Sequence, residues 1–415
     1  MSQSVYVLGA GRTDFKRNFQ RENKTLRHMI LEAGKSAIID AGVDPQDIQA
    51  GIVGNFASGP FTKQLHLGAF LTEIDPRLHG LPTFHTEAAC ASGGVAVLTA
   101  AKLIMGEIHD LVLVVGVEQQ KTMSPAAGAE VLGAAGDFQV ESAQFGDFMF
   151  PKLFGRIAQM YSQRYSLKEV DLARVAVKNN AHARLNPLAQ MRDSPLSMKE
   201  ACTESEANRR IAPPLKVTDC SQITDGGAAV VLCSGRCAAR LAKHPRVRLL
   251  GYGHTTDYLP LEKKDGPTFS VATKAAQQAY SMAGVQPADL DAAELHDCFS
   301  ISEIVGCEVL GFAPRGEGAQ LLASGATALP CARETLELRA SPSALRVQSL
   351  PVNPSGGLMG DGHPVGATGV RQVVEAYRQL TGTAGKYQVE GAQRILTFNM
   401  GGSFTTNVVM IWGGK

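Results

Sequence analysis

The chain has 415 residues, of which 44% are hydrophobic and 19% charged, and its formal net charge at pH 7 is +1. This balance is typical of a globular protein with large cores, and the length allows two or three domains. A charge so close to zero gives no reason to expect a nucleic-acid or acidic-membrane partner. Because no apolar run approaches the roughly 18 residues of a membrane helix and no secretory signal opens the chain, we expect a cytoplasmic protein. Its eight scattered cysteines should be free thiols and form no metal site.

The first half of the chain predicts strands and helices in alternation. Residues 4–9 and 111–117 have the composition of strands, and residues 25–41 that of a helix between them. The segment 111–117 is apolar almost throughout, which is typical of a strand in a sheet that is covered on both faces. Much later, residues 219–232 predict a turn followed by a further strand. Elements that alternate in this way indicate a layered α/β fold.

Residues 121–215 differ in character from the segments on either side. They contain an Ala/Gly-rich stretch at 126–136, a Phe/Met cluster at 144–154, and polar helices further on. We interpret them as a loop domain that covers the active-site face. It is inserted into a first core that comprises residues 1–120 and 216–245.

The second half repeats the first at a constant offset. Gly9 and Gly251 follow similar strand-like segments and lie 242 positions apart, and Gly42 and Gly284, each in an Ala-Gly-Val-x-Pro segment, are separated by the same 242. Two matches at one offset indicate an internal duplication of a strand–helix unit. Residues 246–415 therefore form a second core. The elements expected within it are a helix at 270–283 and closing strands at 395–398 and 408–412.

Cys90 is the candidate nucleophile. It stands in Ala-Ala-Cys-Ala-Ser-Gly-Gly, directly before an Ala/Leu-rich helix, and its small neighbours leave room for a substrate. A cysteine at a helix N-terminus feels partial positive charge, which predicts a lowered thiol pKa. His363, in Gly-His-Pro-Val-Gly-Ala-Thr-Gly, also precedes a helix. A thiol and a histidine that can deprotonate it are the minimum for covalent acyl transfer.

Further polar groups stand in apolar or glycine-rich surroundings. They are the His-Asp-Cys-Phe segment that begins at His296, the segment from Asn353 to His363, and Asn-Met-Gly-Gly from Asn399. At the offset of 242, His296 corresponds to Gly54, so the two segments follow equivalent strands. Parallel strands deliver such loops to one edge of a sheet, where the sites of α/β proteins form. We therefore expect these loops to meet at one site.

These motifs resemble those of the thiolases. Asn-Pro-Ser-Gly-Gly from Asn353, then Gly-His-Pro around His363 and Gly-Ala-Thr-Gly, resemble the C-terminal thiolase signature, and the Cys90 loop resembles the nucleophile loop. The segment at His296 stands where many thiolases have Asn-Glu-Ala-Phe, and it is similar to that of the sterol-carrier-protein-type branch. The resemblance covers nearly the whole chain. It implies a duplicated thiolase fold, with two βα halves in α/β/α/β/α layers.

The resemblance also implies roles for four side chains. Cys90 would attack an acyl-CoA or 3-ketoacyl-CoA and hold the acyl group, while His363 would take the thiol proton. Cys298 would move the proton at the α-carbon of the substrate. His296 would stabilise the enolate oxygen, directly or through a water molecule. The expected enzyme is an acyltransferase that uses coenzyme A thioesters as substrates and needs no other cofactor.

Backbone groups and partners complete the expectation. The amides of Cys90 and Gly401 would form a second oxyanion site, of the kind in which one donor is typically worth about 10²–10³ in rate. Asn353 is a candidate substrate-binding residue. The resemblance implies a homodimer built through the first core.

Two departures from the thiolase pattern leave alternatives open. Thiolases usually carry a second cysteine in a Cys-x-Gly-Gly loop where this chain has Asn399. The connection across residues 313–350 is also longer than usual, with an extension at about 328–348. One alternative is a C-acyltransferase or carbon–carbon lyase that depends on a small zinc-ribbon/OB-fold partner protein. The other is a non-catalytic acyl-CoA binder.

Overall fold

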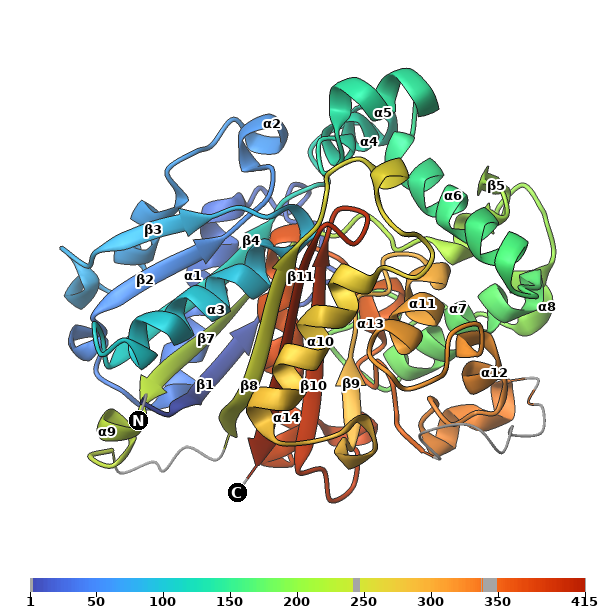
Figure 1. The fold of residues 1–415 in the computed structure, drawn as a ribbon. Coiled ribbons are helices and arrows are strands. Elements are labelled where there is room, and N and C mark those ends of the chain that lie inside the picture. Colours follow the sequence, from blue (N-terminus) through green and yellow to red (C-terminus); the bar gives the residue numbers. More distant parts are fainter. Residues whose placement is uncertain (1–2, 242–246, 337, 339–348, 415) are drawn as a thin grey trace.

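A nine-stranded mixed sheet with helices on its faces runs through the molecule (Figure 1). The computed structural model describes residues 3–241, 247–336, 338 and 349–414. The strands are β1 Val5–Arg12, β2 Ala50–Gly54, β3 Thr83–Thr86, β4 Leu111–Glu118, β5 Arg210–Ala212, β6 Leu215–Lys216, β7 Gly226–Ser234, β8 Val247–Thr256, β9 Ala292–Glu294, β10 Arg394–Gly401 and β11 Thr406–Gly414. The helices are α1 Leu26–Ala41, α2 Ser58–Thr62, α3 Ser92–Met105, α4 Pro125–Gly133, α5 Phe138–Phe145, α6 Met149–Arg164, α7 Glu169–Ala183, α8 Met198–Cys202, α9 Gly235–Ala238, α10 Ser270–Ala283, α11 Ser300–Val309, α12 Gly318–Ala323, α13 Gly357–Gly360 and α14 Thr368–Thr381.

The sheet consists of two halves with the same topology. Its order is β3-β2-β4-β7-β1-β8-β11-β10-β9, and the halves join where β1 pairs with β8 over only two residue pairs. In the first half β3, β2 and β4 are parallel, whereas β7 and β1 are antiparallel to their neighbours. In the second half β9 and β10 are parallel, and β11 and β8 are antiparallel. Val352, which bridges to β9 in parallel, takes the place of β3.

Close packing of helix on strand explains the glycines that repeat in the sequence. A Cβ atom on Gly9 would lie 2.2 Å from the backbone of α1, and one on Gly251 would lie 2.4 Å from the backbone of α10. Only glycine permits an approach this close. Gly42 and Gly284 end these two helices in the left-handed conformation, with φ of 67° and 68°, the usual glycine cap. The internal duplication is therefore visible in the structure.

The helices and the sheet form the layers that the resemblance implied. Helix α1 packs on the outer face of the first half, and α10 packs on the outer face of the second. Helices α3 and α14 lie together between the halves. Their cluster is fully buried or nearly so and includes Val97, Leu98 and Ala101 of α3, Val370, Val373 and Val374 of α14, and Val112, Val230 and Val408 of the strands. Burial of each valine or leucine side chain in this cluster contributes about 1.5–3 kcal/mol to stability.

Helices α4–α8 and the β5–β6 hairpin form the segment expected as a loop domain (Figure 1). Phe154 of this segment stacks on Phe299 of the second core, with ring centroids 4.4 Å apart. The domain boundaries at residues 120, 216 and 245 stay a prediction. Within the extension at 328–348, Pro330–Thr335 forms a 3₁₀ helix, and residues 337 and 339–348 lie outside the described residues.

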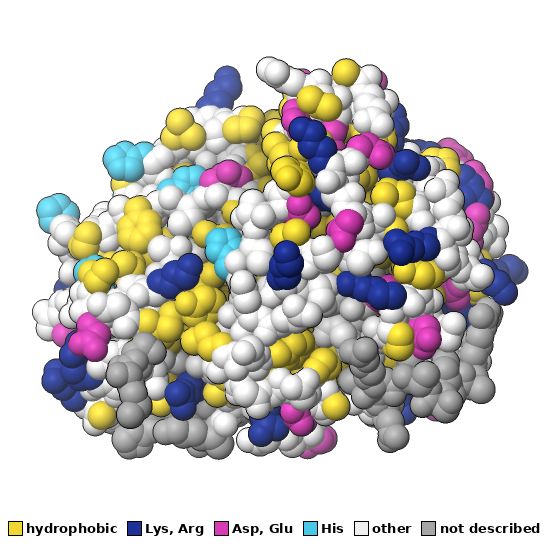
Figure 2. Space-filling model, in the orientation of Figure 1, with side chains coloured by type: hydrophobic (Ala, Val, Ile, Leu, Met, Phe, Trp, Pro, Cys, Tyr) yellow, Lys and Arg dark blue, Asp and Glu magenta, His cyan; other side chains and the backbone are white. Residues whose placement is uncertain are grey.

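The surface carries charges of both signs. Lys and Arg side chains are intermixed with Asp and Glu on the face shown in Figure 2, in keeping with the net charge of +1. No helix among the described residues combines the length and hydropathy that a membrane span requires. All eight cysteines are free, as the sequence analysis expected.

The first turns of α3 and α14 touch backbone to backbone. A Cβ atom on Gly369 would lie 2.1 Å from the backbone nitrogen of Gly94, and one on Gly93 would lie 2.7 Å from the carbonyl oxygen of Gly366. Any side chain at these positions would force the two helices apart. Because the loops of the candidate nucleophile and the candidate base directly precede these helices, this contact sets the separation of the two loops.

Gly369→Ala is expected to destabilise the protein, because overpacking of a close backbone contact costs about 1–3 kcal/mol or more. Gly306→Ala in α11 is the matched control, since its Cβ would meet Leu295 at an ordinary 3.6 Å and alanine favours the helix. Thermal unfolding of both variants provides the measurement. We expect a lower Tm for Gly369→Ala only, and an unchanged Tm would contradict the contact.

Candidate active site

An apolar cavity of about 370 Å³ lies between the loop domain and the two cores. Cys90, Cys298 and His363 all line it, so the structure brings together three residues that the sequence analysis singled out from distant segments. The remaining lining comes from the loop domain, the segment after β6, and the starts of α11 and α14. It includes Leu132, Ala135, Phe148, Phe150, Ile211, Val217, Ile223, Phe299 and Val365.

Cys90 occupies a tight and well-supported turn. It lies in the 3₁₀ helix Ala89–Ala91 directly before α3, and only 3% of its surface is exposed. Ala89 has φ of 50°, a strained conformation for a residue with a side chain and one that clusters at functional sites. The Ser92 hydroxyl braces the turn, since it accepts from Ala88 N at 2.9 Å and donates to Ala89 O at 2.6 Å.

Burial raises the pKa of the Cys90 thiol to about 12, and the nearby carboxylates of Glu118 and Glu87 act in the same direction. The backbone amides of Gly402 and of Cys90 itself favour the thiolate, but by less. The lowered pKa that the sequence analysis expected is therefore wrong for the substrate-free site. Loss of hydration outweighs the helix N-terminus, because a dry pocket disfavours the charged form. The Cys90 thiol is therefore neutral in the substrate-free site.

His363 is positioned as a proton acceptor by Thr368. The Thr368 hydroxyl donates to the carbonyl of Pro364 at 3.1 Å, and its oxygen lies 2.7 Å from Nδ1 of His363. With the hydroxyl proton assigned to the carbonyl of Pro364, Nδ1–H donates to Thr368 and Nε2 carries no proton. Burial, followed by the positive charge of Arg371, lowers the pKa of His363 to about 3. The imidazole is thus neutral, and its Nε2 can accept a proton.

His296 lies beside these two groups. The Sγ of Cys90 and one ring nitrogen each of His296 and His363 lie within 4.8 Å of one another. The two imidazoles meet edge to face, with centroids 5.1 Å apart. Burial lowers the pKa of His296 well below its ordinary value, and His363 acts in the same direction. His296 is therefore neutral as well.

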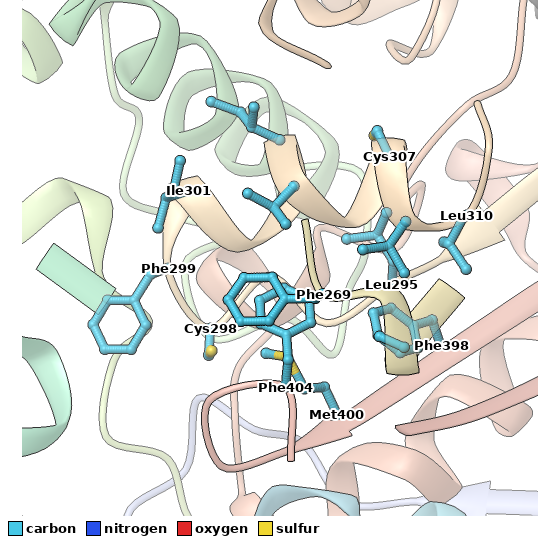
Figure 3. Packing of buried hydrophobic residues seen from close by; sticks show 14 of the residues in the cluster. Phe269, Leu295, Cys298, Phe299, Ile301, Cys307, Leu310, Phe398, Met400 and Phe404 are labelled. Carbon is cyan, nitrogen blue, oxygen red and sulfur yellow. The ribbon is translucent and has the colours of Figure 1, made fainter. Parts of the chain in front are cut away.

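Cys298 stands at the start of α11, between Phe299 on one side and the stacked rings of Phe269 and Phe404 on the other (Figure 3). Its Sγ lies 3.7 Å from the hydroxyl of Ser302. Burial, followed by the neighbouring Cys90, raises the pKa of the Cys298 thiol well above its ordinary value. Both thiols therefore hold their protons until a substrate provides a place for them.

The structure gives the remaining sequence candidates different surroundings. Asn353 is not among the lining residues of the cavity, because its amide is used within the fold. Its Oδ1 accepts from Leu295 N at 2.8 Å, and its Nδ2 donates to Glu303 at 2.9 Å. Gly401 packs against the Cys90 loop, where a Cβ would lie 2.2 Å from Ala88 O. Its oxyanion role stays a prediction.

Sequence reasoning missed Glu118. This buried carboxylate ends β4 and accepts from Asn55 Nδ2 at 2.9 Å, Phe56 N at 3.0 Å, Ala57 N at 3.2 Å and Gly366 N at 3.0 Å. It thereby ties the loop after β2 to the loop that follows His363. Burial raises the pKa of Glu118 to about 7. The sequence feature that could have identified Glu118 is its position as an acidic residue at the end of an otherwise apolar strand.

A buried thiol beside a neutral imidazole, under an apolar cavity in a duplicated α/β core, defines a site for covalent acyl transfer. Residues 5–236 match the family model "Thiolase, N-terminal domain", and residues 253–332 and 340–414 match "Thiolase C-terminal domain-like". The chain therefore belongs to the thiolase family and is a thiolase-type acyltransferase, as the motifs indicated.

Individual relatives agree with this assignment. An acetyl-CoA acetyltransferase of Methanothermobacter thermautotrophicus is 35% identical over 99% of both chains. Sterol carrier protein 2 of Gallus gallus is 29% identical over 97% of this chain and 70% of that protein, which confirms the similarity to the sterol-carrier-protein branch. Among solved structures, a chain of the Ltp2-ChsH2(DUF35) aldolase superposes with a TM-score of 0.78 at 23% identity, over 99% of this chain and 98% of that chain. At this low sequence identity, the similarity to the aldolase chain shows a shared fold only.

The alkylation rate of Cys90 by iodoacetamide is expected to depend steeply on pH. With the thiol pKa near 12, the thiolate fraction rises about tenfold per pH unit between pH 7 and 9. Peptide mass spectrometry separates Cys90 from the other cysteines, and exposed Cys331 reports on the reagent. If the alkylation rate of Cys90 did not change between pH 7 and 9, the conclusion that its thiol is neutral in the substrate-free site would be wrong.

Proposed function

We propose that this chain transfers acyl groups between coenzyme A thioesters through an acyl-Cys90 intermediate, by thiolytic cleavage or Claisen condensation. The observation that carries the proposal is the meeting of Cys90, Cys298 and His363 on one cavity. Two thiols and a neutral imidazole supply a nucleophile, a base for it and a separate proton carrier for the substrate. A chain that only binds acyl-CoA would need none of the three.

Each proton in the cleavage reaction then has a carrier. The Cys90 thiol gives its proton to Nε2 of His363 while Sγ bonds to the keto carbon of a 3-ketoacyl-CoA. The bond between the keto carbon and the α-carbon breaks, and its electron pair forms an enolate, which takes a proton from Cys298. A second coenzyme A thiol attacks the acyl-Cys90 thioester and gives its proton to the Cys298 thiolate. Cys90 leaves and recovers the proton from His363.

The cavity lining supports an apolar acyl group as substrate. Most of the lining is aliphatic or aromatic, and Phe150 and Phe299 form one wall, with ring centroids 6.2 Å apart. Charged side chains enter the lining at Glu206 and Arg209. An acyl chain gains free energy by leaving water for such a wall, by roughly 0.8 kcal/mol for each buried CH₂.

We also propose a cytoplasmic homodimer. Strand β3 is the edge of the sheet in the first core, and Phe84 on it is 39% exposed. An open edge of this kind is a template for pairing with a second copy. Light scattering of the purified chain measures the assembly, and a monomer at micromolar concentration would contradict this proposal.

A second candidate keeps the fold and changes the reaction. The position where thiolases usually have a second cysteine is Asn399, whose amide is bonded to Cys90 O and Gly94 N and offers no thiol to the substrate. This observation favours testing a carbon–carbon lyase or C-acyltransferase that depends on a small zinc-ribbon/OB-fold partner. Activity that appears only after such a partner is added would support it.

Intact mass after incubation with a panel of acyl- and 3-ketoacyl-CoA thioesters tests the proposed function. We expect an acyl-sized gain that free coenzyme A discharges, that is absent in Cys90→Ala, and that is retained in the matched control Cys331→Ala. Cys298→Ala should still be acylated but should exchange the α-hydrogens of acetyl-CoA at least about 10²-fold more slowly, because it loses the acid–base group. An adduct that persists in Cys90→Ala would overturn the assignment of the nucleophile.

A further inference from the structure

The amide of Asn399 has an unambiguous orientation. Asn399 is 1% exposed in β10, where its Oδ1 accepts from Gly94 N at 3.0 Å and its Nδ2 donates to Cys90 O at 3.0 Å. A backbone N–H can only donate and a carbonyl can only accept. The two partners therefore fix which end of the side chain is oxygen and which is nitrogen.

The orientation of Asn399 determines the proton position on His296. Its Nδ2 also lies 3.3 Å from Nδ1 of His296. Because an amide nitrogen is a donor only, Nδ1 of His296 must be the acceptor and carry no proton. A neutral imidazole then holds its proton on Nε2.

The Nε2–H of His296 has no acceptor in the substrate-free site. Nε2 is buried and makes no hydrogen bond with any residue that the structure describes, although His296 belongs to the cluster with Cys90 and His363. Nearly all buried polar groups in folded proteins are paired, and an exception calls for an explanation. A substrate oxygen that becomes negative during the reaction would satisfy this donor.

We propose that Asn399 is a positioning residue that locks His296 in the Nε2–H tautomer and so keeps a donor ready for the enolate oxygen of the substrate. The assignment of that oxygen rests on the proposed function. Thr368 holds His363 in the opposite tautomer, so two imidazoles 5.1 Å apart are committed to different tasks. His363 accepts a proton, and His296 donates a hydrogen bond.

The proposal also accounts for an asparagine where thiolases usually have cysteine. A thiol has one weak donor and could not hold Gly94 N, Cys90 O and His296 Nδ1 together, whereas an amide has an acceptor and two protons for this purpose. The same side chain thus joins the first turn of α3 to the second core and sets the proton on the histidine.

Asn399→Asp is the decisive variant, because it keeps the shape and removes the donor. A carboxylate still accepts from Gly94 N, but it now accepts from Nδ1–H of His296 and moves the proton away from Nε2. Long-range ¹H–¹⁵N spectra of the full-length protein with ¹⁵N-labelled histidine report the protonated nitrogen, and the His296→Asn spectrum assigns the signal. We expect Nε2 protonated in the wild type and Nδ1 protonated in Asn399→Asp.

Kinetics separate tautomer control from simple bracing. In Asn399→Asp the exchange of acetyl-CoA α-hydrogens with D₂O should fall by about 10²–10³, the effect of losing one oxyanion donor. Acylation of Cys90 should fall by less, although the lost bond to Cys90 O and the new negative charge slow it as well. Asn399→Ala leaves both tautomers accessible and should exchange faster than Asn399→Asp, although it loses more contacts. A bracing role predicts the reverse order.

Three results would overturn the proposal: an unprotonated Nε2 in the wild type, an Asn399→Ala variant slower in exchange than Asn399→Asp, or equal losses of exchange and acylation. Failure of the proposed function gives a different result, namely a wild type that acquires no acyl group from any thioester. The tautomer is read from the ¹⁵N shifts in either case, so the two failures remain distinguishable.

Discussion

The backbone contact between the first turns of α3 and α14 is the constraint on which the site depends. Each core half contributes one of these helices, and each helix is preceded by a short 3₁₀ turn, Ala89–Ala91 in the first half and Val365–Ala367 in the second. Glycines at the contact remove the side chains that would separate the helices. The Cys90 loop and the His363 loop therefore meet across the pseudo-symmetry of the duplication, and neither half contains the candidate site alone.

Buried ion pairs also hold the His363 loop against the first core. Arg12 of β1 bonds Asp361 through two nitrogens, each at 2.7 Å, and Glu375 of α14 at 2.8 Å, with all three side chains out of contact with water. Ion pairs of this kind cost much to desolvate, so their use is better understood as specificity than as net stability. Arg12 belongs to the first core, whereas Asp361 lies two residues before His363. The pair thus fixes the histidine loop to the other half.

A dry site explains the electrostatics of the reacting groups. Burial is the largest influence on both thiols and both imidazoles, and it holds all four in their neutral forms. Neither thiol is ionised in the substrate-free site. Negative charge develops only on the substrate oxygen, when a thiol sulfur attacks the carbonyl carbon. The neutral state makes proton positions decisive, because an imidazole can then be a donor or an acceptor at Nε2. Thr368 places the proton of His363 on Nδ1, whereas Asn399 places the proton of His296 on Nε2.

The sequence by itself determined the fold class, the duplication and the residues of the candidate site, because glycine positions, apolar strands and motif order are local features. The offset of 242 between Gly9 and Gly251 was readable without coordinates, and so were Cys90, Cys298, His296 and His363. Only the tertiary structure decided the thiol pKa, since helix position predicts a lowering and burial produces the opposite. It also showed the buried carboxylate of Glu118 beside the Cys90 and His363 loops. It showed as well that Asn399, which stands where thiolases usually have a cysteine, forms hydrogen bonds to Gly94 N and Cys90 O. The orientation of the Asn399 amide depends on Gly94 and Cys90, about 300 residues away in the chain, and the pKa of each thiol depends on burial. A local sequence pattern specifies neither.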